Sequence, residues 1–302
     1  MRRFCRRALG PSLFLLLFAT VTRADEGNHP VSLWQVEGEN NRIYILGSVH
    51  LLRETDHPIP SAIYDAYTDA DVVFMELDMD DADPIADQVL ATELGLIQDY
   101  KTLRDLLGPE KYAQAEVLAN AAQIPLQLLE KSEPWYAAVN IEIMMLMRIG
   151  FSPSYGIEYH LAEMAKRENK EILGFETTRQ QLGFLDNLSA SSQQEMFMQS
   201  LADSAEMAEM MDMLVVAWHN GDIEFLEESL LNDMQQYPEL NQTIVVDRNR
   251  SWAERIETLL THQINYLIVV GTLHLVGSEG VPNLLAKQGH TVIQLKQQSV
   301  TK

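Results

Sequence analysis

The stretch Tyr266-Leu-Ile-Val-Val-Gly271-Thr-Leu-His274-Leu is an unbroken apolar run that ends in a glycine and, three residues later, a histidine. Such a run is typical of a strand buried on both faces, as in a parallel sheet covered by helices. A second stretch, Arg42-Ile-Tyr-Ile-Leu-Gly47-Ser-Val-His50-Leu, has the same order of apolar strand, glycine, small hydroxyl residue, aliphatic residue, histidine and leucine. The repeat indicates one local structure that the fold uses twice.

The two histidines follow the predicted ends of these strands. In open α/β sheets ligands bind outside the carboxyl ends of the strands, so His50 and His274 are placed where a site would form. A glycine at each strand exit lets the backbone turn sharply and approach a ligand or a neighbouring strand. A single histidine in such a position is more often a surface or core residue, but the repeat of the whole pattern favours a site.

Two further predicted strands each end in a glutamate. Residues 71–76 end at Glu76, and residues 172–176 end at Glu176. The remaining signals fit the same architecture: an antiparallel hairpin over 32–46, a helix over 61–67 with Ser61 as its N-cap, a helix that Asp83 caps with Pro84 at its first position, and a C-terminal strand, helix and strand over 267–270, 281–288 and 291–295.

Long helical segments interrupt the strands at about 86–170 and 178–262. The predicted fold class is therefore α/β, with a mainly parallel central sheet, an N-terminal hairpin and large helical insertions. With 46% apolar residues, the chain from 25 to 302 is expected to form a single domain.

The first 24 residues have the features of a secretory signal peptide. Four arginines within residues 1–7 precede a mainly apolar segment over 8–21, and Thr22-Arg-Ala24 supplies small residues for cleavage. The apolar segment is too short for a typical membrane span. We therefore expect an exported protein, periplasmic or secreted, that keeps no stable membrane span; an uncleaved anchor is the alternative.

Charge and cysteine content exclude several classes of function. Removing residues 1–24 takes away five of the 22 basic residues and none of the 44 acidic ones, which leaves 17 basic residues and a formal charge of −27. Phosphate backbones repel such a chain, so nucleic acid is not an expected partner. The single cysteine, Cys5, lies in the predicted signal peptide. Disulfides, thiol catalysis and cysteine metal sites are therefore not expected after cleavage.

The strand-end residues His50, Glu76, Glu176 and His274 form the candidate site. Two imidazoles and a carboxylate are the ligand set of many catalytic zinc or manganese sites, so a divalent ion (Mn, Co or Zn) held by His50, His274 and Glu76 is one interpretation. Such an ion would make a hydrolytic water available, with the remaining carboxylate as general base. The same groups could act without metal, with histidine as base and glutamate as its orienting partner. The residues alone leave both possibilities open.

A cation for a developing oxyanion is the remaining requirement, and Arg248 is the leading candidate. It is expected at the start of a helix, where the helix dipole favours an acid, so its position suggests a functional reason. Arg250 and Arg255 compete for the role, and a surface ion pair is the alternative. Three further residues are candidates for lining the pocket: His57, Glu158 and His160.

Several motifs resemble the TraB/GumN family, in order along nearly the whole predicted mature chain. They are the two Gly-x-x-His segments, the strand ending in Glu76, Lys131-Ser-Glu-Pro-Trp135, Gly156-Ile-Glu158, Gly174-Phe-Glu176-Thr-x-x-Gln-Gln, Asp247-Arg248-Asn249-x-x-Trp252 and Gly271-Thr-Leu-His274-Leu-x-Gly277-x-x-Gly280. The resemblance implies a relation to the Tiki metal-dependent proteases, and more distantly to erythromycin-esterase-like and haem-binding ChaN-like folds.

Carried over by position, the resemblance implies a metal or catalytic set of His50, Glu76, Arg248 and His274. Many family members have Gly-Leu-Glu where this chain has Gly-Phe-Glu176, and often Asp where it has Glu158. The expected function is an exported metal-dependent hydrolase, peptidase-like, with a peptide or small-molecule substrate. The alternatives are a non-catalytic pocket protein for haem, metal or peptide, a metal-free His/Glu hydrolase, and a helical interaction module.

Overall fold

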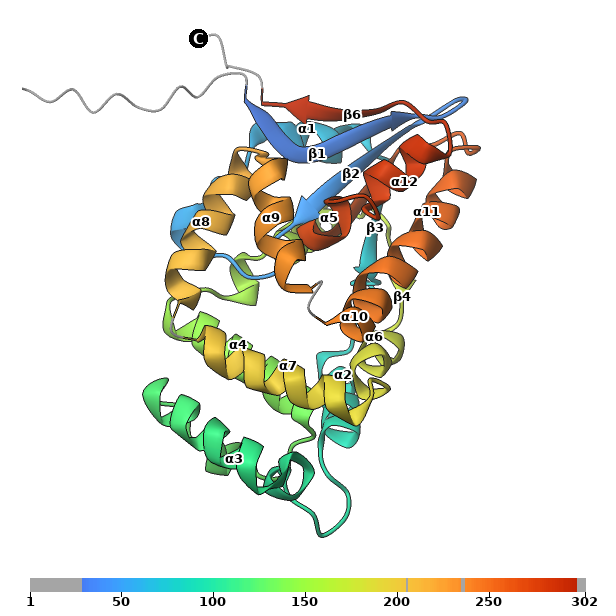
Figure 1. Cartoon of the computed structure of the whole chain (residues 1–302). Coiled ribbons are helices and arrows are strands. Elements are labelled where there is room, and N and C mark those ends of the chain that lie inside the picture. Colours follow the sequence, from blue (N-terminus) through green and yellow to red (C-terminus); the bar gives the residue numbers. More distant parts are fainter. Residues whose placement is uncertain (1–28, 205, 235–236, 298–302) are drawn as a thin grey trace, which may run out of the picture.

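The computed structural model describes residues 29–204, 206–234 and 237–297, so the predicted signal peptide and Cys5 lie outside the described residues. A six-stranded sheet organises the chain (Figure 1), in the order β4-β3-β5-β2-β1-β6. Its strands are β1 (Pro30–Glu37), β2 (Arg42–Ser48), β3 (Val72–Leu77), β4 (Ile172–Glu176), β5 (Tyr266–Gly271) and β6 (Val292–Lys296).

Strands β4, β3, β5 and β2 pair in parallel, and β1 pairs antiparallel with both β2 and β6. The predicted mainly parallel sheet with an N-terminal hairpin is therefore confirmed. In the β2–β5 register, Gly47 lies opposite Val270 and Ser48 opposite Gly271. Because the strands are parallel, the two Gly-x-x-His segments leave the same edge of the sheet side by side. The C-terminal strand β6 does not lie beside β5; it pairs with β1 at the far edge.

Both faces of the sheet are covered, which explains the continuous apolar run in β5. Leu267 and Val269 face a core shared with α1 (Ser61–Asp69), α5 (Ile157–Glu168), α8 (Met207–His219) and α9 (Ile223–Met234). Ile268 and Val270 face a second core shared with α11 (Asp247–Leu259) and α12 (Val281–Lys287). Successive side chains of a strand point to opposite faces, so a strand buried on both sides needs an apolar residue at every position.

The other helices lie mainly in the segments between β3 and β4 and between β4 and β5, as predicted. They are α2 (Pro84–Gly95), α3 (Leu103–Ala121), α4 (Pro134–Arg148), α6 (Thr178–Asp186), α7 (Ala190–Asp203) and α10 (Pro238–Asn241). Helices α3, α4 and α7 share a core of their own at the end of the molecule opposite the sheet (Figure 1). The predicted insertions thus combine this helical core with helices that cover the sheet. No helix of the described residues is long and apolar enough to cross a membrane.

Two predicted helix starts have different outcomes. Asp83 caps α2, where its side chain accepts hydrogen bonds from the amides of Ile85 and Ala86, with Pro84 in the first turn. The prediction that Ser61 caps α1 is wrong: Pro60 takes the N-cap position and Ser61 is the first helical residue. The proline side chain has no hydrogen-bond acceptor, so no side-chain cap is formed there.

Gly156 packs the start of α5 against the candidate site. It is the N-cap of α5 and lies against the backbone of the first Gly-x-x-His segment. A Cβ at this position would lie 2.0 Å from the carbonyl oxygen of His50. We expect Gly156→Ala to lower the free energy of unfolding by about 1–3 kcal/mol, measured by chemical denaturation, because the backbone must shift. Gly183→Ala is the control, since its Cβ would meet only Asn187 at 3.5 Å. Equal stability of both variants would contradict the close packing at Gly156.

Candidate functional site

The two Gly-x-x-His segments are tied to each other at the carboxyl edge of the sheet. The hydroxyl of Thr272 donates a hydrogen bond to the carbonyl of Ser48 (2.8 Å). A Cβ on Gly271 would lie 3.2 Å from Nε2 of His50 and 3.4 Å from Oε1 of Glu76. A larger residue where β5 ends would therefore press on two functional side chains that converge over the Gly271 backbone.

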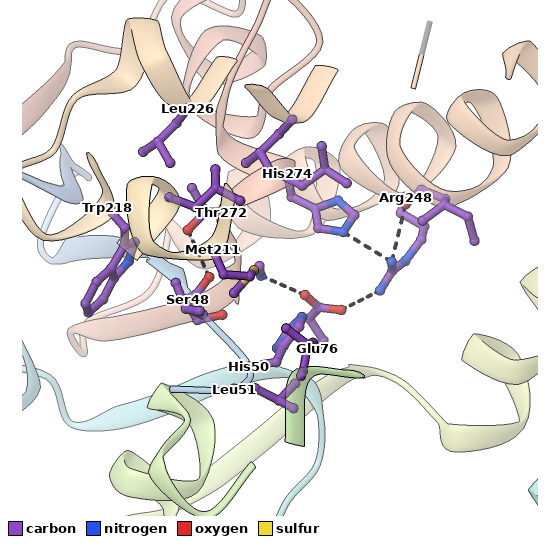
Figure 2. Close-up of a pocket in the computed structure, with 17 residues that line it drawn as sticks. Ser48, His50, Leu51, Glu76, Met211, Trp218, Leu226, Arg248, Thr272 and His274 are labelled. Atoms are coloured by element: carbon purple, nitrogen blue, oxygen red, sulfur yellow. Dashed lines mark hydrogen bonds and ion pairs between the residues drawn. The ribbon is translucent and has the colours of Figure 1, made fainter. Parts of the chain in front are cut away.

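Arg248 lies at the centre of the site and is 7% exposed, so the surface ion-pair interpretation is wrong (Figure 2). Its Nε donates to Oε1 of Glu176 (2.8 Å), and one terminal nitrogen donates to Glu176 (2.8 Å) and to Glu76 (2.6 Å). The other terminal nitrogen contacts Nε2 of His274 (3.2 Å) and the carbonyl of Ile244 (3.3 Å). A guanidinium has five N–H donors, so all of them are engaged.

The helix that carries Arg248 does not begin there. A π-helical turn (Gln242–Val246) runs directly into α11, and Val246 and Asp247 have helical backbone angles. The predicted position at a free helix N-terminus, and the dipole argument that rested on it, are therefore wrong. Instead the π turn and the start of α11 bring Arg248 and the carbonyl of Ile244 together, and such turns are frequent at functional sites.

Glu76 is a buried carboxylate with both oxygens engaged. Oε1 accepts from the amide of Gly271 (2.7 Å), and Oε2 accepts from Arg248 and from Gln181 (3.0 Å). Burial works to raise the pKa of Glu76, but the charges of its neighbours and the Gly271 amide outweigh burial and lower the pKa to about 2. The neighbours are His274, His50 and Arg248. Glu76 is therefore ionised at neutral pH.

His274 is 4% exposed and is held in one orientation. Its Nδ1 lies 2.7 Å from Oδ1 of Asn249, whose amide nitrogen donates to the carbonyl of Glu279 (2.8 Å). Since Oδ1 can only accept, Nδ1 of His274 carries the proton and Nε2 accepts from Arg248. Burial lowers the pKa of His274 to about 3. The ring is therefore neutral at neutral pH, and Arg248 and His50 are the cations that hold Glu76 ionised there.

His50 differs from His274 because its side chain is 58% exposed. Its Nδ1 lies 2.7 Å from Oε1 of Glu158, which also accepts from the hydroxyl of Ser48. The Glu158 carboxylate raises the pKa of His50 to about 9. Burial opposes ionisation of Glu158, but the charge of His50 and the two hydrogen bonds lower its pKa overall. The structure thus contains one charged and one neutral strand-end histidine.

His50 and Glu76 line two cavities. The first, of about 380 Å³, is bounded by the strand ends, Arg248, His274 and a largely aliphatic wall (Figure 2). The second, of about 340 Å³, is also lined by Glu158, Gln181 and the residues that follow: Met75, Leu77, Met79, Pro153 and Tyr159. A substrate that occupied both cavities would therefore pass over His50 and Glu76.

Comparison with known proteins identifies the family of this chain. The TraB/PrgY/gumN family model matches residues 32–294, which contain every strand-end residue described above. The chain belongs to the TraB/PrgY/gumN family. It is 21% identical over 246 residues to the uncharacterized protein YbaP of Escherichia coli K12, a match that covers 82% of this chain and 88% of YbaP. YbaP of Shigella flexneri matches with the same identity and coverage. No solved structure matches significantly.

The structure brings together six of the residues predicted for this site: His50, Glu76, Glu158, Glu176, Arg248 and His274. His57 and His160 lie elsewhere, with ring centroids 5.2 Å apart. Nε2 of His57 contacts the carbonyl of Tyr155, and that of His160 contacts the Tyr64 hydroxyl. Neither histidine is among the residues that line the two cavities.

The competing arginines also lie outside the site. Arg250 forms an exposed ion pair with Glu279 (2.9 Å), and Arg255 lies over the ring of Phe74. Sequence reasoning assigned no role to Asn249 or Gln181, which orient His274 and Glu76. Both residues occur inside the motifs of the TraB/PrgY/gumN resemblance, and that was the only signal for them.

The side chains of the site are of the types that bind a divalent ion, but only two of the three predicted ligands converge on one point. Nε2 of His50 and Oε1 of Glu76 converge over Gly271, and Nε2 of His50 has no hydrogen bond within the described ranges. The third donor, Nε2 of His274, faces Arg248. Accordingly, among the residues that the structure describes, no three His, Asp or Glu side chains are grouped closely enough to hold a metal ion.

Asn249 can be tested as the residue that faces Nδ1 of His274. In Asn249→Asp a carboxylate would face Nδ1 of His274, and this charge favours the imidazolium. We expect the pKa of His274 to rise above its value of about 3, measured by NMR titration of the imidazole signals. The signal of His160, whose pKa is lowered by burial, serves as the control and should not move between the two proteins. An unchanged His274 would show that Asn249 does not face its Nδ1.

Proposed function

We propose that this chain is an exported metal-dependent hydrolase that cleaves an amide or ester bond, with peptides as the first substrate class to test. One observation carries the proposal. His50 and Glu76 lie between two cavities at the carboxyl edge of a parallel sheet, next to the buried network of Arg248. This is where α/β proteins bind ligands, and such a cluster of perturbed titratable groups is typical of active sites.

In the absence of a bound ion, the chain's own groups supply an acid. His50 is an imidazolium at neutral pH, its Nδ1 proton is held by Glu158, and its Nε2–H is free to face a substrate oxygen or leaving group. That proton can be donated to a leaving nitrogen, or can stabilise a developing oxyanion. Glu158 acts through His50 by fixing its orientation, and is therefore a positioning residue.

Arg248 suits a positioning role better than the oxyanion role expected from the sequence. With its five N–H groups engaged by Glu76, Glu176, His274 and Ile244, it has none left for a substrate oxygen in this arrangement. It neutralises two buried carboxylates and holds the ring of His274. The guanidinium also lies 4.6 Å from the ring centre of Trp252, which fixes its plane.

A strong general base is what these groups lack, and this supports the need for a cofactor. Glu76 is ionised but stabilised by its hydrogen bonds, and the pKa of His274 is lowered to about 3, so both are weak bases. A bound divalent ion supplies a water molecule with a pKa near 7 and polarises a carbonyl. His50, Glu76 and His274 would hold it, which requires His50 to lose its Nε2 proton and Nε2 of His274 to exchange Arg248 for the ion. His50 would then be a ligand and no longer the acid.

The test begins with metal content. Wild-type protein lacking residues 1–24 and the His50→Ala/His274→Ala double variant are loaded with manganese, cobalt or zinc, dialysed and measured by plasma mass spectrometry. We expect about one ion per chain in the wild type and none in the variant. The His57→Ala/His160→Ala variant is the matched control and should bind like wild type. A peptide library is then screened for cleavage with the bound ion. Absence of metal in the wild type would contradict the metal-dependent mechanism and favour metal-free His/Glu chemistry.

The second candidate is a pocket protein that binds without turnover. It is favoured by the aliphatic wall of the first cavity, which could hold an apolar ligand such as haem or a peptide. Binding would then shift the visible absorption band of added haem, and the shift would change in His50→Ala, which removes the exposed imidazole. A band that stays at the position of free haem would remove haem from consideration.

A further inference from the structure

The first cavity has a wall made almost entirely of aliphatic side chains. Helices α8 and α9 contribute Met211, Leu214, Leu226 and Leu230, and α4 contributes Leu146. Trp218 is the one Phe, Tyr or Trp residue among the lining residues, and its Nε1 donates to the carbonyl of Gly47 (2.6 Å), so this hydrogen bond holds the ring in place. Figure 2 shows Met211 near His50 and Glu76, with Trp218 and Leu226 on the side of the pocket away from Arg248.

Most of this wall is only partly buried, although it lies inside the molecule. Leu146, Met211, Leu214 and Leu230 pack against the sheet core but are not covered by other side chains of the protein as core residues are. Leaving such apolar surface in contact with water is unfavourable, and covering it with an apolar ligand group recovers that free energy. Leucine and methionine adapt to flexible ligands more readily than aromatic residues do.

The polar end of the cavity restricts what can be attached to that apolar group. His50 and Arg248 also line this end, and each has a carboxylate partner: Glu158 pairs with His50, and Glu76 and Glu176 pair with Arg248. A free carboxylate on the ligand would meet the carboxylate of Glu76 and, among the lining residues, no unpaired cation. A neutral carbonyl meets no such repulsion.

We infer that the first cavity selects a substrate with a flexible aliphatic group next to the reacting neutral carbonyl, while the rest of the substrate continues past His50 and Glu76 into the second cavity. The inference rests on the proposed function for the carbonyl, but the aliphatic contacts do not depend on turnover. The aliphatic group can belong to an amino-acid side chain or to an acyl chain, because both present the same methylene surface.

Binding of two neutral ligand series tests this inference. One series consists of straight-chain primary amides from butanamide to decanamide; the other consists of N-acetyl amino-acid amides with side chains from alanine to norleucine. Affinity for the protein lacking residues 1–24, measured by calorimetry, should rise about four-fold per methylene until the cavity is full. A rise in the amide series alone assigns an acyl chain, and a rise in the peptide series alone assigns a side chain. Affinity independent of length in both series would overturn the inference.

Substitutions at Met211 and Met213, on the same turn of α8, test whether the aliphatic group binds in the first cavity. Met211→Trp fills the cavity and should end the gain in affinity at a shorter chain, whereas Met211→Ala enlarges it and should extend the gain to longer chains. Met213→Trp is the matched control: it lies on the same helix, is 46% exposed and does not line the first cavity, so its affinities should equal those of wild type. Equal effects of both tryptophan variants would overturn the inference.

Hydrolysis is measured on the same ligands with the metal-loaded protein. Length-dependent binding without any cleavage would contradict the proposed hydrolase and leave the aliphatic site standing. Cleavage with no dependence on aliphatic length would support the hydrolase and overturn the inference.

Discussion

Arg248→Ala is expected to lower the free energy of unfolding by about 3–5 kcal/mol, the largest effect of any single substitution in the site. The guanidinium is the shared partner of Glu76 and Glu176, whose side chains are about one tenth exposed. Its removal leaves two buried carboxylates without their cation and removes the donor to Nε2 of His274. An unpaired buried charge is much more costly than the loss of an exposed pair.

Urea denaturation followed by circular dichroism measures this loss. Arg250→Ala is the matched control, because Arg250 lies two residues further along α11 in an exposed ion pair, and its loss should change stability by less than about 1 kcal/mol. Arg248→Lys should recover only part of the stability, since an ammonium group cannot make the two parallel contacts to Glu176. Comparable small losses at Arg248 and Arg250 would contradict the buried network.

The second large effect separates the two strand-end histidines. We expect His50→Ala to lower turnover by about 10²–10⁴-fold, with a smaller loss of stability than His274→Ala. The His50 side chain is 58% exposed, so its removal opens no cavity in the core, although the Glu158 carboxylate loses its cationic partner. His274→Ala should lose turnover and stability together, since His274 is buried between Asn249, Arg248 and the ring of Trp252, 4.6 Å away. Both histidines lie at strand ends, but we expect only the buried one, His274, to be important for stability.

Peptide cleavage with the bound ion and thermal denaturation are the two measurements for each variant. His57→Ala is the control, because His57 contacts the carbonyl of Tyr155 and lies outside both cavities. Full turnover in His50→Ala would remove His50 from the proposed mechanism. A wild-type melting temperature in His274→Ala would contradict the buried hydrogen bond to Asn249.

The sequence by itself determined the sheet and the edge at which the site forms. The apolar runs of β3 and β5 are continuous because both faces of these strands are buried, and that pattern can be read without any knowledge of distant contacts. Parallel strands end at the same edge of a sheet, so Glu76 near the end of β3, and His50 and His274 just after β2 and β5, had to lie near one another.

Only the tertiary structure decided the charges and partners within the site. Glu158 makes His50 cationic, and burial keeps His274 neutral while Asn249 orients its ring. Arg248 is engaged by groups from β3, β4, the π turn and the segment after β5. These properties depend on side chains that helices far apart in the sequence bring within hydrogen-bond distance, and on how much water they exclude. Local sequence patterns encode the backbone of single elements, but not which side chains of different elements meet.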